Sequence, residues 1–147
     1  MFNTQHERIE QIKGALPARP QTNLSMPVIL IVENDEDNRM MLKFLLEAWK
    51  YRVLEAADGT EALIIAEQER PDLILMDVKL PVLDGFDTTR QIRQSPKINA
   101  VPIVFLSGCA EANARQAAAT AGGNEYLVKP INFQELEQML GKYVRRR

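Results

Sequence analysis

Five short apolar runs alternate with helical patterns along this chain, and this alternation constrains its fold most strongly. The runs are rich in apolar and β-branched residues, as expected of strands that are covered on both faces. Strands that alternate with helices through short loops predict a parallel sheet with helices on both of its faces. The predicted strands are Val28–Val32, Tyr51–Ala56, Asp72–Met76, Val101–Leu106 and Glu125–Val128.

The helical patterns lie between and after these strands. The first helix is expected to begin at an Asp37 cap and to bury one apolar side. The residues predicted for that side are Met40, Met41, Phe44, Leu45 and Ala48. The other helices are predicted after Asp58-Gly59, after Asp84-Gly85, at Ala110–Ala119 and at Phe133–Tyr143. Right-handed crossovers then favour an α/β, doubly wound, flavodoxin-like sheet of order 2-1-3-4-5 with five helices.

Residues 1–26 differ from the rest of the chain. Ile9, Ile12 and Leu16 have helical spacing, and a polar stretch with two prolines follows them. We therefore expect an N-terminal extension at 1–26, with a short helix and a linker, and one domain at 27–147. Few residues follow the last predicted helix, so the sequence predicts no covalently attached output domain.

The composition argues against several classes of protein. A net charge of −2 provides no electrostatic footprint for nucleic acid or for an anionic membrane. No apolar stretch approaches the roughly 20 residues of a membrane span, and the charged amino terminus lacks the apolar core of a secretory signal. The single cysteine, Cys109, excludes an intrachain disulfide framework. These features predict a soluble, cytoplasmic domain with no nucleic-acid and no membrane partner.

Polar residues stand where four of the predicted strands end. They are the run Glu33-Asn34-Asp35, Asp77, Ser107 and Lys129. Because the carboxyl ends of parallel strands meet at one crevice, we expect these side chains to converge. Carboxylates beside a lysine can hold a divalent cation next to a phosphoryl group. Asp77 could then attack phosphorus, while Lys129 and Ser107 could bind phosphoryl oxygens.

Four stretches of the chain resemble the receiver domain of two-component response regulators. They are Val28–Arg39, Pro71–Phe86, Val101–Gly108 and Glu125–Ile131. The resemblance covers about Pro27 to Tyr143. It implies phosphorelay signalling, in which a histidine kinase or phosphotransfer protein donates a phosphoryl group in the presence of Mg²⁺. It also implies that the chain is not an ordinary enzyme, although it supports phosphoryl transfer to its own aspartate and the hydrolysis of that phosphate.

The resemblance implies a role for each matched site residue. Asp77 resembles the phosphoacceptor, and Lys129 resembles the lysine that contacts the phosphoryl group. Ser107 resembles the switch hydroxyl that moves toward the phosphate, and Tyr126 resembles the aromatic switch that swings inward behind it. The Lys129-Pro130 bond stands where such domains often have a cis peptide, which proline makes less costly.

The implied metal site departs from the family pattern at one position. The family usually has two adjacent acids after the first strand, and here the second place holds Asn34. The ligands implied for Mg²⁺ are Glu33, Asn34, Asp77 and the backbone carbonyl of Lys79. Three outcomes are open: Asn34 ligates through its amide oxygen, Asp35 takes the role, or Glu33 and Asp77 suffice with waters. We favour the first, since a loop shift would disturb the strand register, and expect weaker Mg²⁺ binding without loss of phosphorylation.

Partners and rival functions follow from the same residues. A kinase or phosphotransfer protein acts upstream and an unknown output protein downstream, with a homodimer through Ala110–Ala119, Glu125–Val128 and Phe133–Tyr143 as an alternative. A pseudo-receiver, which binds partners without phosphorylation, is the main rival, and Asn34 is the feature that favours it. A flavin protein would need a phosphate-binding loop where this chain has acids. A related phosphatase would need an acid where Lys79 stands.

Overall fold

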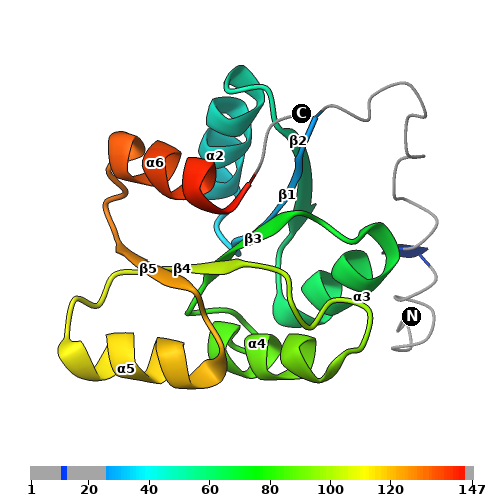
Figure 1. The fold of residues 1–147 in the computed structure, drawn as a ribbon, viewed down its shortest axis with the longest axis vertical. Helices are drawn as coiled ribbons and strands as arrows, with labels where there is room; N and C mark the ends of the chain where they lie inside the picture. Colours follow the sequence, from blue (N-terminus) through cyan, green and yellow to red (C-terminus); the bar gives the residue numbers. More distant parts are fainter. Residues whose placement is uncertain (1–10, 13–25, 145–147) are drawn as a thin grey trace.

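The chain alternates strand and helix from β1 to α6 in the computed structural model, which describes residues 11–12 and 26–144 (Figure 1). The strands are β1 (Val28–Val32), β2 (Arg52–Ala56), β3 (Leu73–Asp77), β4 (Ile103–Ser107) and β5 (Glu125–Val128). The helices are α2 (Glu36–Ala48), α3 (Gly59–Glu69), α4 (Gly85–Gln94), α5 (Ala112–Ala121) and α6 (Phe133–Tyr143). Apart from the start of α2, these bounds agree with the predicted strands and helices to within about two residues.

The five strands form one parallel sheet in the order β2-β1-β3-β4-β5, which confirms the predicted flavodoxin-like topology. Val32 at the end of β1 pairs with Met76 of β3. The residues that follow them, Glu33 and Asp77, therefore reach the carboxyl edge of the sheet side by side. Ser107 ends the neighbouring strand β4 at the same edge.

Helices cover both faces of the sheet: α2 and α6 lie on one face, and α3, α4 and α5 lie on the other (Figure 1). Successive side chains of a strand point to opposite faces, so each strand contributes to both sides. In β1, Ile29 and Ile31 pack with Leu42 and Leu136 of α2 and α6. Leu30 and the residues two positions before and after it in β1 pack in the apolar cluster on the α3–α4–α5 side. Both faces of β1, β3 and β4 are buried, which explains their continuous apolar runs.

Aspartate side chains cap the amino ends of several helices. Asp58 and Asp84 each accept a hydrogen bond from a backbone N–H three residues later, as their positions before α3 and α4 predict. The predicted cap of α2 is wrong. Asp35 caps this helix by accepting a hydrogen bond from the Asn38 N–H at 3.2 Å, while Asp37 lies inside the first turn.

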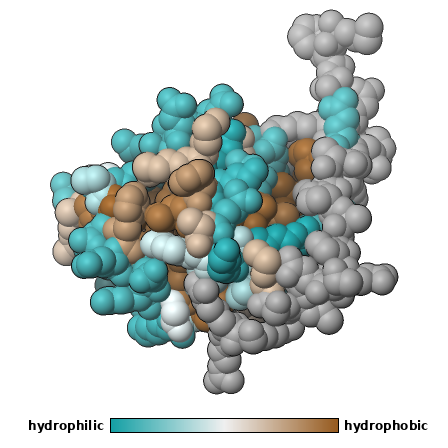
Figure 2. Space-filling model, turned by 90° about the horizontal axis from the view of Figure 1, so that it is seen from above, coloured by the Kyte–Doolittle hydropathy of each residue, from teal (hydrophilic) through white to brown (hydrophobic). Residues whose placement is uncertain are grey.

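The predicted buried side of α2 is also wrong, except at Leu45, which is partly buried against the sheet-facing cluster. Leu42 and Leu46 face the sheet and are almost fully buried, whereas Met40, Met41 and Phe44 are 59%, 47% and 78% exposed. Both sets have helical spacing, so the sequence period alone cannot choose between them. The packing against β1 and β3 decides, because it places the branched leucines against the sheet. Figure 2 shows apolar residues among polar ones on the face that α2 and α6 form.

Of the N-terminal extension, the structure describes Gln11, Ile12 and Met26. Gln11 and Ile12 are helical, and Ile12 packs against the apolar cluster on the α3–α4–α5 side. The rest of the predicted helix at His6–Leu16 lies outside the described residues. The Lys129-Pro130 peptide is cis, which confirms that prediction. Among the helices of residues 26–144, none is long and apolar enough to cross a membrane.

Gly85, in the first turn of α4, lies so close to the backbone of Asp77 that there is no room for a β-carbon at this position. A Cβ added at Gly85 would lie 2.3 Å from the Asp77 carbonyl oxygen, whereas nothing lies within 4 Å of one added at Gly141. We expect Gly85→Ala to destabilise the protein by about 2 kcal/mol through this overlap. Gly141→Ala, the matched control, should stabilise it by roughly 0.5–1 kcal/mol because alanine favours the helix. Urea unfolding measures both, and an unchanged Gly85→Ala midpoint would contradict the close approach.

Candidate functional site

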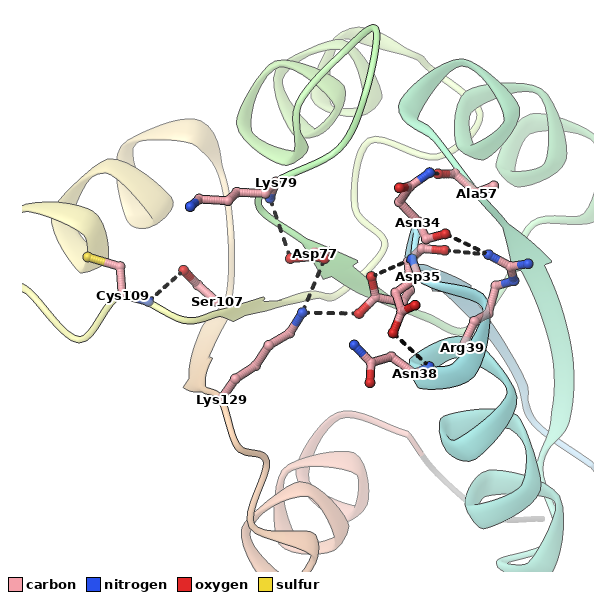
Figure 3. A network of polar contacts seen from close by, with 11 residues as sticks. Asn34, Asp35, Asn38, Arg39, Ala57, Asp77, Lys79, Ser107, Cys109 and Lys129 are labelled. Carbon is pink, nitrogen blue, oxygen red and sulfur yellow. Dashed lines mark hydrogen bonds and ion pairs between the residues drawn. The ribbon is translucent and has the colours of Figure 1, made fainter.

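Three polar side chains meet at the carboxyl edge of the sheet. Asp77 ends β3, Glu33 follows β1, and Lys129 follows β5. The Lys129 ammonium donates to Glu33 Oε1 at 3.0 Å and to Asp77 Oδ2 at 3.2 Å, as the dashed lines from Lys129 mark in Figure 3. The sheet order makes this contact, because it places the ends of β1 and β3 side by side with β5 one strand beyond β4.

The two carboxylates are buried and share a single cation. The Glu33 and Asp77 side chains are 3% and 9% exposed, whereas the Lys129 side chain is 29% exposed. Two buried carboxylates with one ammonium leave an excess negative charge, which costs free energy in a poorly solvated site. The arrangement therefore favours a further cation, or a proton, between the two acids.

The burial of these groups and their closeness to one another shift the pKa values of all three. Burial and the neighbouring Glu33 carboxylate raise the pKa of Asp77 from 3.8 to about 6, although Lys129 acts in the opposite direction. Burial also works against the ionisation of Glu33. Its contacts with Asp77, with Lys129 and with the Asp35 N–H nevertheless hold its pKa below the ordinary value. Burial likewise opposes the charge of Lys129, but the two carboxylates outweigh it and raise the pKa of the ammonium. Of the two acids, Asp77 is the one that takes up a proton first.

Ser107 and Tyr126 are linked through the loop after β4. The Ser107 hydroxyl accepts a hydrogen bond from the Cys109 N–H at 3.1 Å. The Tyr126 hydroxyl donates to the carbonyl of the same residue, and its ring lies 5.1 Å from the Arg115 guanidinium carbon. Both switch candidates are buried. The sequence offered no signal for this role of Cys109, since its backbone makes both contacts.

The side chains of Asn34 and Asp35, in the loop between β1 and α2, form hydrogen bonds outside the cluster of Glu33, Asp77 and Lys129. The exposed Asn34 donates a long hydrogen bond from its side-chain nitrogen to the Ala57 carbonyl at 3.4 Å, on the side of the loop away from Lys129 (Figure 3). The Asp35 carboxylate is engaged at the start of α2. A metal role for Asp35 would therefore remove the cap of that helix. On the other side of Asp77, the Lys79 N–H lies 3.4 Å from Asp77 Oδ1, and the Lys79 side chain is exposed.

The donor set suits a hard cation that keeps several waters. In the described part of the chain, no three acidic, histidine or cysteine side chains cluster closely enough to hold a metal. Mg²⁺ is usually bound through only one or two carboxylates, with waters and phosphate oxygens completing its octahedron. The paired carboxylates of Glu33 and Asp77 and their excess negative charge fit this pattern.

The sequence of this chain matches the response regulator receiver domain over residues 29–141. The chain belongs to this family. Receiver domains are the phosphorelay signalling modules of two-component response regulators, and they are signalling proteins more than enzymes. The topology described above is the topology of this family.

Several known proteins are similar to this receiver domain. An uncharacterised 14.6 kDa protein of Leptolyngbya boryana is 38% identical over 78% of this chain and 88% of its own length. The transcriptional regulatory protein PrrA of Mycobacterium tuberculosis is 36% identical, and the match spans 86% of this chain but only 53% of PrrA. This chain thus spans about half the length of that regulator.

A solved structure resembles the fold closely. The receiver domain of the sensor histidine kinase PA1611 from Pseudomonas aeruginosa superposes with a TM-score of 0.75 at 40% identity, covering 80% of this chain and 97% of that one. That protein was crystallised with a magnesium ion coordinated in its active-site cleft.

The raised pKa of Asp77 predicts a pH-dependent cost of folding in the absence of metal. The unfolded carboxyl ionises near 3.8 and the folded one near 6, so the folded state binds more protons between these values. Stability should therefore fall as the pH rises through this range and level off above it. In EDTA, we expect Asp77→Asn to exceed the wild type by about 2 kcal/mol above pH 7. Denaturant unfolding from pH 4 to pH 8 measures this difference, which should shrink toward pH 4. A gap that stays constant with pH would contradict the assignment.

Proposed function

We propose that this receiver domain accepts a phosphoryl group on Asp77 from a histidine kinase or a phosphotransfer protein, with Mg²⁺ as cofactor. The observation that supports this most directly is the buried Asp77 carboxylate at the end of β3, paired with Lys129 at 3.2 Å beside a second acid. We extend the proposal to the domain boundaries, with the receiver at 27–147 and an extension at 1–26, and to a cytoplasmic location.

The residues of the site suit an in-line transfer to a carboxylate. An Asp77 oxygen would attack phosphorus as the bond to the donor nitrogen breaks, leaving an acyl phosphate on Asp77 and the bonding electron pair on the donor imidazole. With a pKa of about 6, the carboxyl is mostly ionised at neutral pH, as an attacking group requires. The Lys129 ammonium now bonds the Asp77 carboxylate. It lies close enough to bind a phosphoryl oxygen instead, once negative charge develops there.

The proposed metal ligands are Glu33, Asn34, Asp77 and the backbone carbonyl of Lys79. Bound there, Mg²⁺ would supply neutralisation of the phosphoryl charge. Asn34 would contribute its amide oxygen once its side chain turns toward Asp77 and gives up the long hydrogen bond to Ala57. The same residues would support hydrolysis of the aspartyl phosphate by water.

The contacts of Ser107 suggest how phosphorylation is transmitted. A phosphoryl oxygen on Asp77 would compete for the Ser107 hydroxyl, which now accepts from the Cys109 N–H. Because the carbonyl of Cys109 accepts from Tyr126, a shift of this loop would reach the face that α5, β5 and α6 form. This two-state change would alter a binding surface for an output protein or for a second copy of the chain.

Asn34→Asp tests the proposed metal site. Adding a charge at this position should tighten Mg²⁺ binding by about 5- to 10-fold, because ligand charge strongly affects cation affinity. Asn99→Asp is the matched control: it adds the same charge at an exposed residue between α4 and β4, at the opposite end of the sheet, where it should change the affinity less than twofold. Calorimetric titration at constant ionic strength measures all three proteins. Equal affinities for the wild type and Asn34→Asp would show that Asn34 is not a ligand.

Beryllofluoride and acetyl phosphate test the phosphoacceptor. With Mg²⁺ and acetyl phosphate, the wild type should gain one phosphoryl group in intact-mass spectra, and Asp77→Ala should gain none. Glu137→Ala removes an exposed acid of α6 and should behave like the wild type. Light scattering with and without beryllofluoride then reports whether phosphorylation changes self-association. Absence of any Asp77-dependent adduct would favour the pseudo-receiver, which Asn34 alone supports.

A further inference from the structure

Arg39 joins the loop of the site to the edge of the sheet. Its Nη1 donates to the Glu33 carbonyl oxygen at 2.7 Å and lies 3.4 Å from the Asn34 carbonyl oxygen. Its Nε lies 3.5 Å from Glu55 Oε1 on β2. The side chain is 19% exposed, and Figure 3 shows it beside Asn34 on the side of the loop away from Lys129 and Asp77.

These contacts hold the backbone of the loop that carries the proposed metal ligands. The Glu33 N–H is bonded to the Ala56 carbonyl, which continues the pattern of the sheet by one residue. In the loop that follows, the Arg39 guanidinium binds two successive backbone carbonyls, those of Glu33 and Asn34. A guanidinium is suited to these contacts because it is planar and presents several N–H donors in fixed directions. Its Nη1 faces the two carbonyls while its Nε faces the Glu55 carboxylate.

We propose that Arg39 is a positioning residue for metal binding: it orders the backbone of Glu33 and Asn34, the two residues of this loop that are proposed to bind the metal. It contacts none of the reacting atoms. The role deepens the proposed function, on which its metal-binding consequence rests, while the ordering of the loop does not depend on any metal. With Asn34 in place of an acid, the site has less charge with which to attract a cation. Its affinity then depends more on how well the ligands are already placed.

A neighbouring lysine provides a matched control. Lys43 lies one turn further along α2, and its Nζ is 3.4 Å from the other oxygen of Glu55. It therefore shares the ion pair but makes no contact with the loop carbonyls that Arg39 binds. Removing Lys43 tests the loss of a cation near Glu55, whereas removing Arg39 also releases the loop.

The experiment compares the wild type with Arg39→Ala, Arg39→Lys and Lys43→Ala in two measurements. Amide hydrogen exchange in EDTA follows the segment 33–36 without metal, and calorimetry follows the binding of Mg²⁺ alone. For Arg39→Ala we expect exchange at least about 10-fold faster in this segment and Mg²⁺ binding about 10-fold weaker. Arg39→Lys should recover only part of either loss, because one ammonium cannot span both carbonyls and Glu55. Lys43→Ala should match the wild type within about twofold.

Two results would overturn the proposal. One is wild-type exchange in segment 33–36 of Arg39→Ala, and the other is an equal loss of Mg²⁺ affinity in Lys43→Ala. Melting temperatures of all four proteins separate a local effect from general destabilisation, because global unfolding would accelerate exchange throughout the sheet. If the wild type bound no Mg²⁺ at all, the proposed metal site would fail, whereas the exchange measurement would still decide whether Arg39 orders the loop.

Discussion

The functional site depends on one ammonium group held between two buried carboxylates. Lys129 contacts Glu33 and Asp77 at once, and these residues come from three different strand ends. Without that cation, two nearly inaccessible negative charges would face each other in a poorly solvated crevice. Burial, together with the neighbouring Glu33, still raises the pKa of Asp77, so one ammonium does not fully offset the cost of ionising this carboxyl. The site is thus prepared for a second cation and for a group that carries negative charge to Lys129.

The surrounding contacts extend from this cluster in two directions. Toward α2, the loop after β1 is held by its carbonyls through Arg39 and by the cap that Asp35 provides. Toward α5, the loop after β4 is held by Ser107 on one side of Cys109 and by Tyr126 on the other. We propose that the first set of contacts positions metal ligands and that the second transmits a change at Asp77 to the face formed by α5, β5 and α6. Both sets act largely through backbone atoms, which leaves the cluster itself to a few side chains.

Much of the fold followed from the sequence because the strands are buried on both faces and their apolar runs are unmistakable. The candidate site followed for a related reason, since residues after successive parallel strands meet at one edge. The errors occurred where local signals were ambiguous. Asp35 and Asp37 are both acceptable helix caps, and α2 has two apolar stripes of similar spacing. Arg39 escaped notice because its partners in the loop are carbonyl oxygens, which every residue has.

By itself, the sequence determined the strand order, the helices, the family and the residues that gather at the carboxyl edge, because each depends on local pattern or on chain connectivity. Only the tertiary structure decided which side of α2 faces the sheet. It also decided how Asn34 and Asp35 are oriented and which cation bridges Glu33 and Asp77. These depend on distances of a few ångströms between segments far apart in the chain, where packing and desolvation outweigh local preference.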